Sequence, residues 1–308
     1  MAQQTEEIEV EGRRLRLSKR DKVLYPATGT TKGEVVAWYH RVAPLMLPHV
    51  AERALTRKRF PDGVDTAGFF EKNCPPYRPE WMDTVSVHSR RIDDKQTEYC
   101  VVHSAAGLVW LANLAAIELH PSLHLADDLA HPLVMVFDLD PGDDVGLKEC
   151  VALARRIRSL LEDVGLRVFV KLSGGKGLHL WVPLRDATYE QTKPFAKAIA
   201  RLLAETHPDA VTARMSKAER SGRIFIDWSQ NDRNKTTVAA YSLRARDEPT
   251  ISLPVGWDEL LRARKPEKFR LTLHEALKRI ERVDDPWQDL YDAAAPLPDA
   301  AAINGIRT

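Results

Sequence analysis

The chain has 308 residues, 44% of them hydrophobic, which is enough for one large domain or two ordinary ones with a real core. Its 45 Lys and Arg residues almost balance its 44 Asp and Glu residues, so the formal charge of +1 provides no global attraction to nucleic acid or membrane. No apolar run approaches the roughly 20 residues that span a bilayer, which excludes a membrane protein and predicts a cytoplasmic one.

Cysteine usage indicates the redox environment. Cys74, Cys100 and Cys150 lie far apart in the sequence and form no C-x-x-C pair. This spacing disfavours both a disulfide framework and a structural zinc site. A reducing compartment fits the pattern best.

The first 130 residues have weak periodicity and are typical of an α/β module. After a tail over 1–16, the predicted elements are helices over 32–47 and 108–119, strands near 54–58 and 68–70, and a hairpin over 85–102. The charged stretch 90–97 is predicted to be an exposed loop between the hairpin strands. His120 would end the second helix, where a structural imidazole is the default interpretation.

From residue 133 onward the pattern is clearer. It predicts, in order, a strand over 133–139, a helix over 146–164, strands over 167–172 and 178–183, a helix over 189–206 and a strand over 223–228. This β-α-β-β-α-β order is the ferredoxin-like or RNA-recognition-like unit, with helices on one face of a sheet and the other face free to hold a site. The fold class is therefore α+β, with this unit packed on the N-terminal module. Helices over 257–264 and 273–282 are predicted to follow.

Two carboxylates close the first strand of this unit. Asp138 and Asp140 lie two residues apart and point to the same side of the strand, because side chains alternate across it. Leaving both ionised beside an apolar strand is unfavourable unless a cation or strong donor lies between them, and hard oxygen donors favour Mg²⁺ or Mn²⁺. The alternative is a solvated turn in which Asp140 caps the chain reversal.

Asp227 ends the last strand of the unit, which in this topology neighbours the first strand. Three converging carboxylates would form a two-metal site for phosphoryl or nucleotidyl transfer, although a lone Asp at a strand end is commonly a cap. The turn from Ser173 to His179 holds three glycines, whose backbone amides can approach a phosphate, together with Ser173, Lys176 and His179. It lacks Walker A spacing, and an ordinary glycine-rich hairpin is the alternative.

Basic and aromatic side chains recur near these elements. A triphosphate would need cations beside the carboxylates, and the candidates are Lys58, Arg220, Lys235 and Arg244, each of which is otherwise a surface residue. Lys19, Lys22 and Lys32 surround the start of a predicted helix, whose N-terminal amides suit an anion. Phe69 and Phe70 point to opposite faces of a strand, so one is free to stack on a base while the other is expected in the core.

Together these motifs resemble a known family. The six ordered motifs are Asp21-Lys-Val-Leu-Tyr-Pro26, Arg57-Lys-Arg-Phe-Pro-Asp-Gly-Val64, Phe69-Phe-Glu-Lys72, Phe137-Asp-Leu-Asp-Pro141, Ser173-Gly-Gly-Lys-Gly-Leu-His179 and Asp227-Trp-Ser-Gln230. They resemble the polymerase domain of bacterial ligase D and its stand-alone Prim-PolC type relatives in the archaeo-eukaryotic primase superfamily. The resemblance runs from about Leu17 to Leu290.

The resemblance implies specific roles for the matched residues. It implies two Mn²⁺ or Mg²⁺ ions held by Asp138, Asp140 and Asp227. It assigns the incoming nucleotide to Lys58, Phe70, His120, Ser173, Lys176, His179, Arg220 and Arg244. It assigns DNA binding to Lys19, Lys22, Lys32, Phe69 and Phe70. The three lysines would form a pocket for a downstream 5′-phosphate. The segment 87–97 aligns with a mobile loop used in end synapsis.

The resemblance also implies a nucleotidyltransferase. We expect template-directed addition of NTPs or dNTPs, with a preference for ribonucleotides, at short gaps or breaks in bacterial DNA repair. We expect a nucleoid-associated monomer with Ku and a DNA ligase as possible partners. We place the catalytic domain over 17–292, divided at 130 and 250 into an N-terminal module, the βαββαβ unit and a helical part, with a tail over 293–308. A two-metal nuclease or phosphodiesterase and a non-catalytic DNA-end adaptor are the alternatives.

Overall fold

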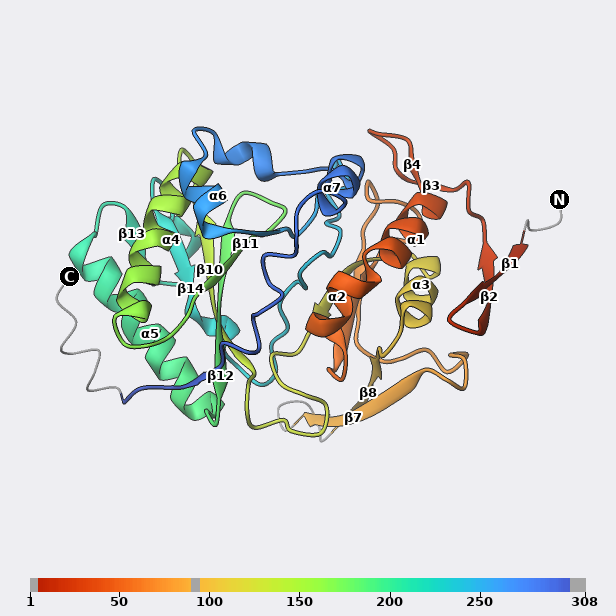
Figure 1. Cartoon of the computed structure of the whole chain (residues 1–308), viewed down its shortest axis with the longest axis horizontal. Coiled ribbons are helices and arrows are strands. Elements are labelled where there is room, and N and C mark those ends of the chain that lie inside the picture. Colours follow the sequence, from red (N-terminus) through yellow and green to blue (C-terminus); the bar gives the residue numbers. More distant parts are fainter. Residues whose placement is uncertain (1–4, 90–94, 300–308) are drawn as a thin grey trace. The chain divides into compact units, whose positions relative to one another are not determined.

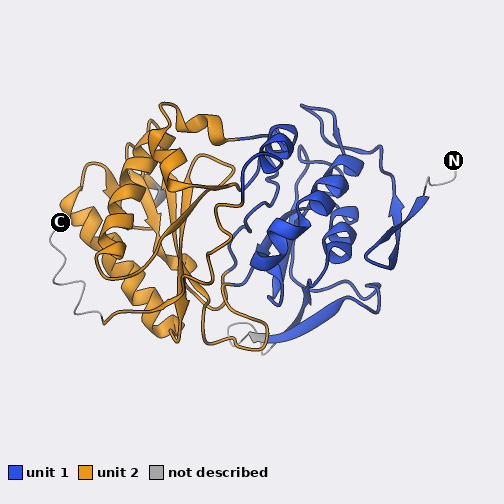
Figure 2. Cartoon of the chain, viewed as in Figure 1, with its two compact units in different colours: residues 1–122, 236–252, 271–284 blue, residues 123–235, 253–270, 285–308 orange. Residues whose placement is uncertain are grey.

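The computed structural model describes residues 5–89 and 95–299, and the chain divides into two compact units (Figures 1 and 2). Unit 1 comprises residues 1–122, 236–252 and 271–284, and unit 2 comprises residues 123–235, 253–270 and 285–308. Among the described residues, no helix combines the length and apolarity needed to cross a bilayer.

Unit 2 is built on a seven-stranded sheet with the order β13-β14-β10-β12-β11-β15, and β16 lies beside β12. The strands are β10 (Val134–Pro141), β11 (Phe169–Leu172), β12 (Leu178–Arg185), β13 (Val211–Thr212), β14 (Ile224–Asp227), β15 (Pro254–Val255) and β16 (Ala295–Pro296). The four strands of the predicted unit pair antiparallel in the order β14-β10-β12-β11. This is the order of a βαββαβ unit, so that prediction is confirmed.

Two amphipathic helices, α4 (Leu147–Glu162) and α5 (Tyr189–Thr206), both contact β10 and lie on one face of this sheet (Figure 1). The shorter helical elements of unit 2 are η1 (Lys217–Glu219), η2 (Trp228–Gln230), α6 (Trp257–Arg262) and η3 (Pro266–Phe269). Leu139 of β10 is fully buried, whereas Asp138 and Asp140 on either side of it are partly or largely exposed. Because strand side chains alternate, the two carboxylates lie on the sheet face that α4 and α5 leave open.

The C-terminal segment is held to unit 2 by a buried tryptophan pair. The ring centroids of Trp181 and Trp287 are 5.1 Å apart, and the indole nitrogen of Trp287 donates to the Val170 carbonyl at 3.1 Å. Residues 295–296 then pair in parallel with β12. The expectation of a tail from residue 293 is therefore wrong at its start, because backbone pairing orders these residues. Residues 300–308 lie outside the described part of the chain.

Unit 1 contains a five-stranded sheet with the order β6-β5-β8-β7, in which β9 also pairs with β5. Its strands are β5 (Leu55–Arg59), β6 (Phe69–Glu71), β7 (Asp83–Ser89), β8 (Lys95–Val101) and β9 (Ala116–Pro121). The short pairs β1–β2 (Thr5–Val10, Arg13–Ser18) and β3–β4 (Val23–Tyr25, Thr30–Thr31) precede it. The helices in the described part of this unit are α1 (Lys32–Arg41), α2 (Ala43–Val50), α3 (Ala105–Asn113) and α7 (Leu273–Ile280).

Several sequence predictions for unit 1 are wrong. The expected tail over 1–16 contains the β1–β2 hairpin. The single helix predicted over 32–47 is broken at Val42. Pro44, in the first turn of α2, has no backbone N–H to donate to the preceding turn of a continuous helix. Of the exposed loop predicted over 90–97, residues 95–97 belong to β8, and residues 90–94 lie outside the described part of the chain. In the segment 87–97, which the resemblance aligns with a mobile loop, residues 87–89 belong to β7.

The predicted helix over 108–119 is also wrong in its second half. Helix α3 ends at Asn113, Ala115 adopts a positive φ of 57°, and residues 116–121 form β9. The apolar run fits a buried helix or a buried strand equally well, and pairing with β5 selects the strand. His120 therefore lies in a strand and does not end a helix.

Residues beyond 235 are shared between the units. Residues 236–252, most of which were expected in the βαββαβ unit, belong to unit 1, as do residues 271–284 with α7. Backbone hydrogen bonds explain the assignment of the first segment, since the amide of Ala239 donates to the Leu119 carbonyl at 2.9 Å. The expected helical part over 251–292 is thus divided between the two units.

The interpretation of the cysteines is wrong for two of them. Cys74 and Cys100 form a disulfide with their Cα atoms 4.9 Å apart, while Cys150 is a buried free thiol. The sequence separation of 26 residues hides this contact. It arises because Asn73 bridges to Tyr99 and thereby places Cys74 beside β8.

Candidate active site

Three polar side chains form a row across the centre of the unit 2 sheet. Asp138 on β10 lies directly opposite Asp227 on β14 and, on its other side, directly opposite His179 on β12. Directly opposed residues on antiparallel strands point to one face, with Cβ atoms about 5 Å apart. Asp140 shares that face, two residues further along β10. The fold therefore brings all three predicted carboxylates to one face of one sheet.

Each carboxylate has its own protein partners. Asp138 Oδ1 lies 3.3 Å from His179 Nε2, and Asp140 Oδ2 accepts from Arg220 Nη1 at 3.0 Å. Asp227 accepts from the amide and hydroxyl of Ser229 and from the side chain of Gln230, at 2.6–2.9 Å. The Ser229 and Gln230 contacts fix the orientation of Asp227, and sequence reasoning did not identify them as supporting residues.

The carboxylate pair fits a divalent cation in its chemistry. Asp138 and Asp227 are like charges in directly opposed positions, which is destabilising without a cation or strong donors nearby. Their oxygens are the hard donors that Mg²⁺ and Mn²⁺ prefer. Within the described ranges, however, no three His, Cys, Asp or Glu side chains group closely enough to hold a metal ion. A metal site made by all three Asp residues stays a prediction.

The glycine-rich turn lies directly against the strand that carries these carboxylates. A side chain at Gly177 would place its Cβ 2.0 Å from the carbonyl oxygen of Leu139, so only glycine allows this approach. The Ser173 hydroxyl accepts from the amides of Gly175 and Gly177 at 3.2 and 3.3 Å. Lys176 is largely exposed, with its Nζ 4.0 Å from Asp143. The predicted strand-to-strand turn is confirmed, and Ser173, Lys176, His179 and Arg220 all accompany the carboxylates in unit 2.

A second group of predicted residues meets in unit 1. Lys58 and Phe70 are directly opposed on β5 and β6, with Lys58 Nζ 5.6 Å from the Phe70 ring. The Phe70 ring packs edge-on against His120, with a centroid distance of 5.6 Å. Phe69 and Phe70 are 46% and 61% exposed, so the expectation that one is in the core is wrong. The strand β6 is short and pairs only at its β5 side among the described strands, which leaves both rings accessible.

Glu118 connects two members of this group and was not predicted. Its carboxylate contacts His120 Nε2 at 2.9 Å and Arg244 Nε at 3.3 Å, and accepts from the Ala245 amide at 3.0 Å. Burial alone would raise the pKa of Glu118, but these donors lower it to about 2, so the side chain is an anion although it is only 3% exposed. Reading 116–121 as a strand would have placed Glu118 and His120 on one face.

The three lysines predicted for a 5′-phosphate are electrostatic neighbours in unit 1. Lys32 is the first residue of α1, as predicted, and its Nζ donates to Ser18 and to the Asn113 carbonyl, both at 3.1 Å. Burial, and then the charges of Lys19 and Lys22, lower the pKa of Lys32 to about 8. Lys22 pairs with Asp62 at 2.7 Å. Burial is the main cause of the lowered pKa, and the charges of Lys19 and Lys22 add to it.

Comparison with known proteins identifies the family of the chain. A family model described as the LigD primase-polymerase domain matches residues 31–287. The chain belongs to this family. The multifunctional non-homologous end joining protein LigD of Mycolicibacterium smegmatis is 41% identical over 289 residues, which cover 93% of this chain and 37% of that protein. The bifunctional non-homologous end joining protein LigD of Bacillus subtilis is 28% identical over 296 residues, covering 96% and 47%.

A solved structure, the polymerase domain from Mycobacterium tuberculosis ligase D in complex with DNA, matches with a TM-score of 0.83 and 40% identity. The match covers 92% of this chain and 99% of that one. The LigD resemblance and the α+β primase-polymerase fold are thereby confirmed, and the chain is a nucleotidyltransferase of the polymerase type. It spans less than half the length of both LigD relatives named above.

Proposed function

We propose that the chain adds NTPs or dNTPs to primer 3′ ends under template direction, at short gaps or breaks that carry a downstream 5′-phosphate. The observation that supports this most is the placement of Asp138 opposite Asp227, with His179 and Arg220 as cationic or donor partners. The LigD relatives act in non-homologous end joining by name, and the structural neighbour binds DNA. Gap filling or end joining, a ribonucleotide preference, and partnership with Ku and a DNA ligase are parts of the same proposal.

In this proposal Asp138, Asp140 and Asp227 hold two Mn²⁺ or Mg²⁺ ions. Such ions would activate the primer 3′-hydroxyl for attack on the α-phosphate and neutralise charge on the departing pyrophosphate. Arg220, which pairs with Asp140 at 3.0 Å, would exchange that carboxylate for a triphosphate oxygen when the nucleotide binds. Ser173, Lys176 and His179 would donate to the other phosphate oxygens.

The unit 1 residues are proposed to recognise nucleotide and DNA. Lys58, His120 and Arg244 would contact the incoming nucleotide, and Glu118 would hold the last two in orientation. Phe69 and Phe70 would stack on bases, which their exposure permits. Lys19, Lys22 and Lys32 would bind the 5′-phosphate of the downstream strand.

An extension assay tests the proposal against its alternatives. A gapped duplex is incubated with each NTP or dNTP and Mn²⁺, with and without a downstream 5′-phosphate. We expect nucleotide-dependent lengthening of the primer that is lost in Asp227→Ala. Shortening of the primer would support a two-metal nuclease or phosphodiesterase, and tight binding without extension would support a DNA-end adaptor; either result would refute the polymerase.

The depressed pKa of Lys32 predicts that 5′-phosphate recognition is sensitive to alkaline pH. Lys32 is charged below its pKa of about 8 and loses its proton as the pH rises through that value. We expect the affinity ratio between phosphorylated and unphosphorylated gaps to fall several-fold between about pH 7 and about pH 9. Fluorescence anisotropy of labelled gapped duplexes measures this ratio at each pH.

Two variants serve as matched controls for this titration. In Lys32→Arg the guanidinium stays charged, so the ratio should vary little over the same range. In Lys22→Ala one neighbouring positive charge is removed, and the midpoint of the titration should move to higher pH. A ratio that is the same at both pH values in the wild type would show that Lys32 does not contact the 5′-phosphate.

A further inference from the structure

An open groove in unit 1 follows directly after the strand that carries Phe70. It has a volume of about 550 Å³. Its lining includes Phe70, Glu71, Lys72, Cys74, Pro75 and Tyr77. Tyr77 is 64% exposed. Across residues 5–89 and 95–299, the exposed large hydrophobic side chains include only three aromatic ones, and these are Phe69, Phe70 and Tyr77. The exposed aromatic surface of the described chain is thus gathered at β6 and this groove.

A tight turn presents Tyr77 to solvent. The amide of Arg78 donates to the Pro75 carbonyl at 3.0 Å, which places Pro76 and Tyr77 at the two central positions of a β-turn. Proline is favoured at the first central position because its ring fixes φ. Pro75 is buried while Pro76 and Tyr77 are exposed, so the turn is rooted in the unit and its tip projects outward. A ring held in this way loses little conformational entropy when it stacks.

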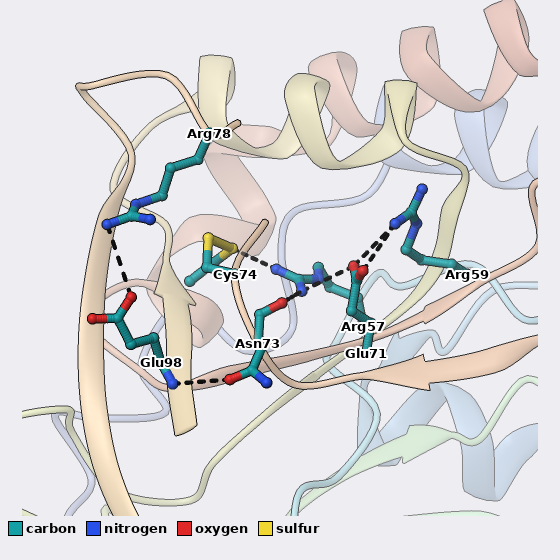
Figure 3. Close-up of a disulfide and its surroundings, with 8 residues drawn as sticks. Arg57, Arg59, Glu71, Asn73, Cys74, Arg78 and Glu98 are labelled. Atoms are coloured by element: carbon teal, nitrogen blue, oxygen red, sulfur yellow. Dashed lines mark hydrogen bonds and ion pairs between the residues drawn. A yellow bond between two sulfur atoms is a disulfide. The ribbon is translucent and has the colours of Figure 1, made fainter. Parts of the chain in front are cut away.

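The base of the turn is anchored to β8 by several independent contacts (Figure 3). The Cys74–Cys100 disulfide is accompanied by a hydrogen bond from the Cys74 amide to the Glu98 carbonyl at 2.6 Å. The Asn73 side chain accepts from the Glu98 amide at 3.1 Å. The buried Arg57 guanidinium contacts Cys100 Sγ and donates to the Asn73 carbonyl. The disulfide is the covalent member of this anchor.

Charge around the groove favours an anionic ligand. Glu71 is neutralised by Arg57 and Arg59, each with an ion pair at 3.0 Å. Glu98 lies 4.0 Å from Arg78. Lys58 and Lys72 have no carboxylate partner among the described residues, which leaves surplus positive charge beside an aromatic surface. Exposed aromatic rings next to uncompensated lysines are the combination that binds single-stranded nucleic acid without sequence preference.

We propose that Tyr77 and the groove beside it bind unpaired bases of a single strand that continues past Phe70, and that the Cys74–Cys100 disulfide holds Tyr77 in position for this. The strand would be the unpaired part of a template, which rests on the proposed function. The bases stack on Tyr77, and the backbone phosphates contact Lys72. Phe70 and Tyr77 then form one continuous stacking surface.

Equilibrium binding tests the proposal without requiring nucleotide addition. The probes are a labelled duplex with a single-stranded oligothymidine tail and the same duplex without a tail. We expect Tyr77→Ala to lower affinity for the tailed duplex about tenfold, since stacking is worth roughly 1–3 kcal/mol per base, and to leave the untailed duplex unaffected. Tyr77→Phe keeps the ring and should restore binding, and Leu261→Ala, at an exposed apolar position in unit 2, should behave as wild type.

Reduction tests the role of the disulfide. Dithiothreitol supplies two electrons and two protons, which convert the disulfide to two thiols while the reagent closes to its own cyclic disulfide. Tailed-duplex affinity of the wild type should fall several-fold, and Cys74→Ser/Cys100→Ser should be weak with or without the reagent. If Tyr77→Ala binds the tailed duplex as tightly as the wild type does, Tyr77 is not a stacking surface. If reduction leaves the wild-type affinity for the tailed duplex unchanged, the disulfide does not hold Tyr77 in its binding position. A protein that shows the Tyr77 effect but no primer extension would refute only the polymerase function.

Discussion

Asp138→Asn is expected to reduce primer extension by about 10³-fold while leaving the protein as stable as the wild type or more stable. The loss follows from removing a carboxylate proposed to hold a divalent ion, whose charge stabilisation is worth several kcal/mol. The variant should be no less stable because asparagine removes the like-charge repulsion between residue 138 and the directly opposed Asp227. Its side-chain oxygen also keeps the contact with His179. Single-turnover extension and thermal unfolding measure the two effects.

Asp144→Asn provides the matched control for this substitution. Asp144 is exposed and has a φ of 67°, a conformation that asparagine tolerates well. Extension and thermal stability should both match the wild type. A second readout is the shift in unfolding temperature on adding Mn²⁺. The ion should raise the unfolding temperature of the wild type but not that of Asp138→Asn. If Asp138→Asn retained full extension, Asp138 would have no part in catalysis.

Glu118→Gln is expected to be costly for stability and for activity. The substitution removes the negative charge that faces His120 and Arg244 in a site that is only 3% exposed. Breaking a buried charge pair on one side costs about 3 kcal/mol or more of unfolding free energy. We also expect kcat/KM for nucleotide addition to fall by one to two orders of magnitude, because Arg244 loses the partner that orients it. Denaturant unfolding and steady-state extension measure these effects.

The pH dependence of stability tests whether the loss of the Glu118 charge causes the destabilisation of Glu118→Gln. Its folded pKa of about 2 is below the usual value of 4.5, so its contribution is complete above about pH 4.5 and is lost as the pH falls toward 2. The stability difference between wild type and Glu118→Gln should therefore narrow in acid. Asp258→Asn, at a largely exposed pair with Arg262, should change neither stability nor activity. A difference that stays constant down to about pH 2 would contradict the assigned ionisation.

The sequence predicts unit 2 well because its elements have strong, local signals. The helix over Tyr189–Thr206 has the bounds that periodicity predicts, and the strand that carries Asp138 differs only by one or two residues at each end. The opposition of Asp138 and Asp227 follows from topology, since the first and last strands of a βαββαβ unit are neighbours. The sequence alone therefore predicts that the candidate carboxylates lie on one face of the sheet.

Unit 1 was harder to predict because tertiary contacts decide its local structure. The run from Leu114 to Leu119 fits two periodicities, and only pairing with β5 makes it a strand. That error hid Glu118, whose importance depends on Arg244 from a distant part of the sequence. The disulfide was missed for the same reason, because the Asn73–Tyr99 bridge that aligns Cys74 with Cys100 has no sequence signature.

The interleaving of the two units has a consequence for biosynthesis. Unit 1 contains the N-terminus, yet residues 236–252 and 271–284 also belong to it. The strands that carry Asp138 and Asp227 are complete when residue 227 has been added. Arg244 is added afterwards. Translation therefore supplies the four strands of the βαββαβ unit before unit 1 has all of its residues, so the sheet that carries the carboxylates can pair while residues 236–252 and 271–284 of unit 1 are still to be added.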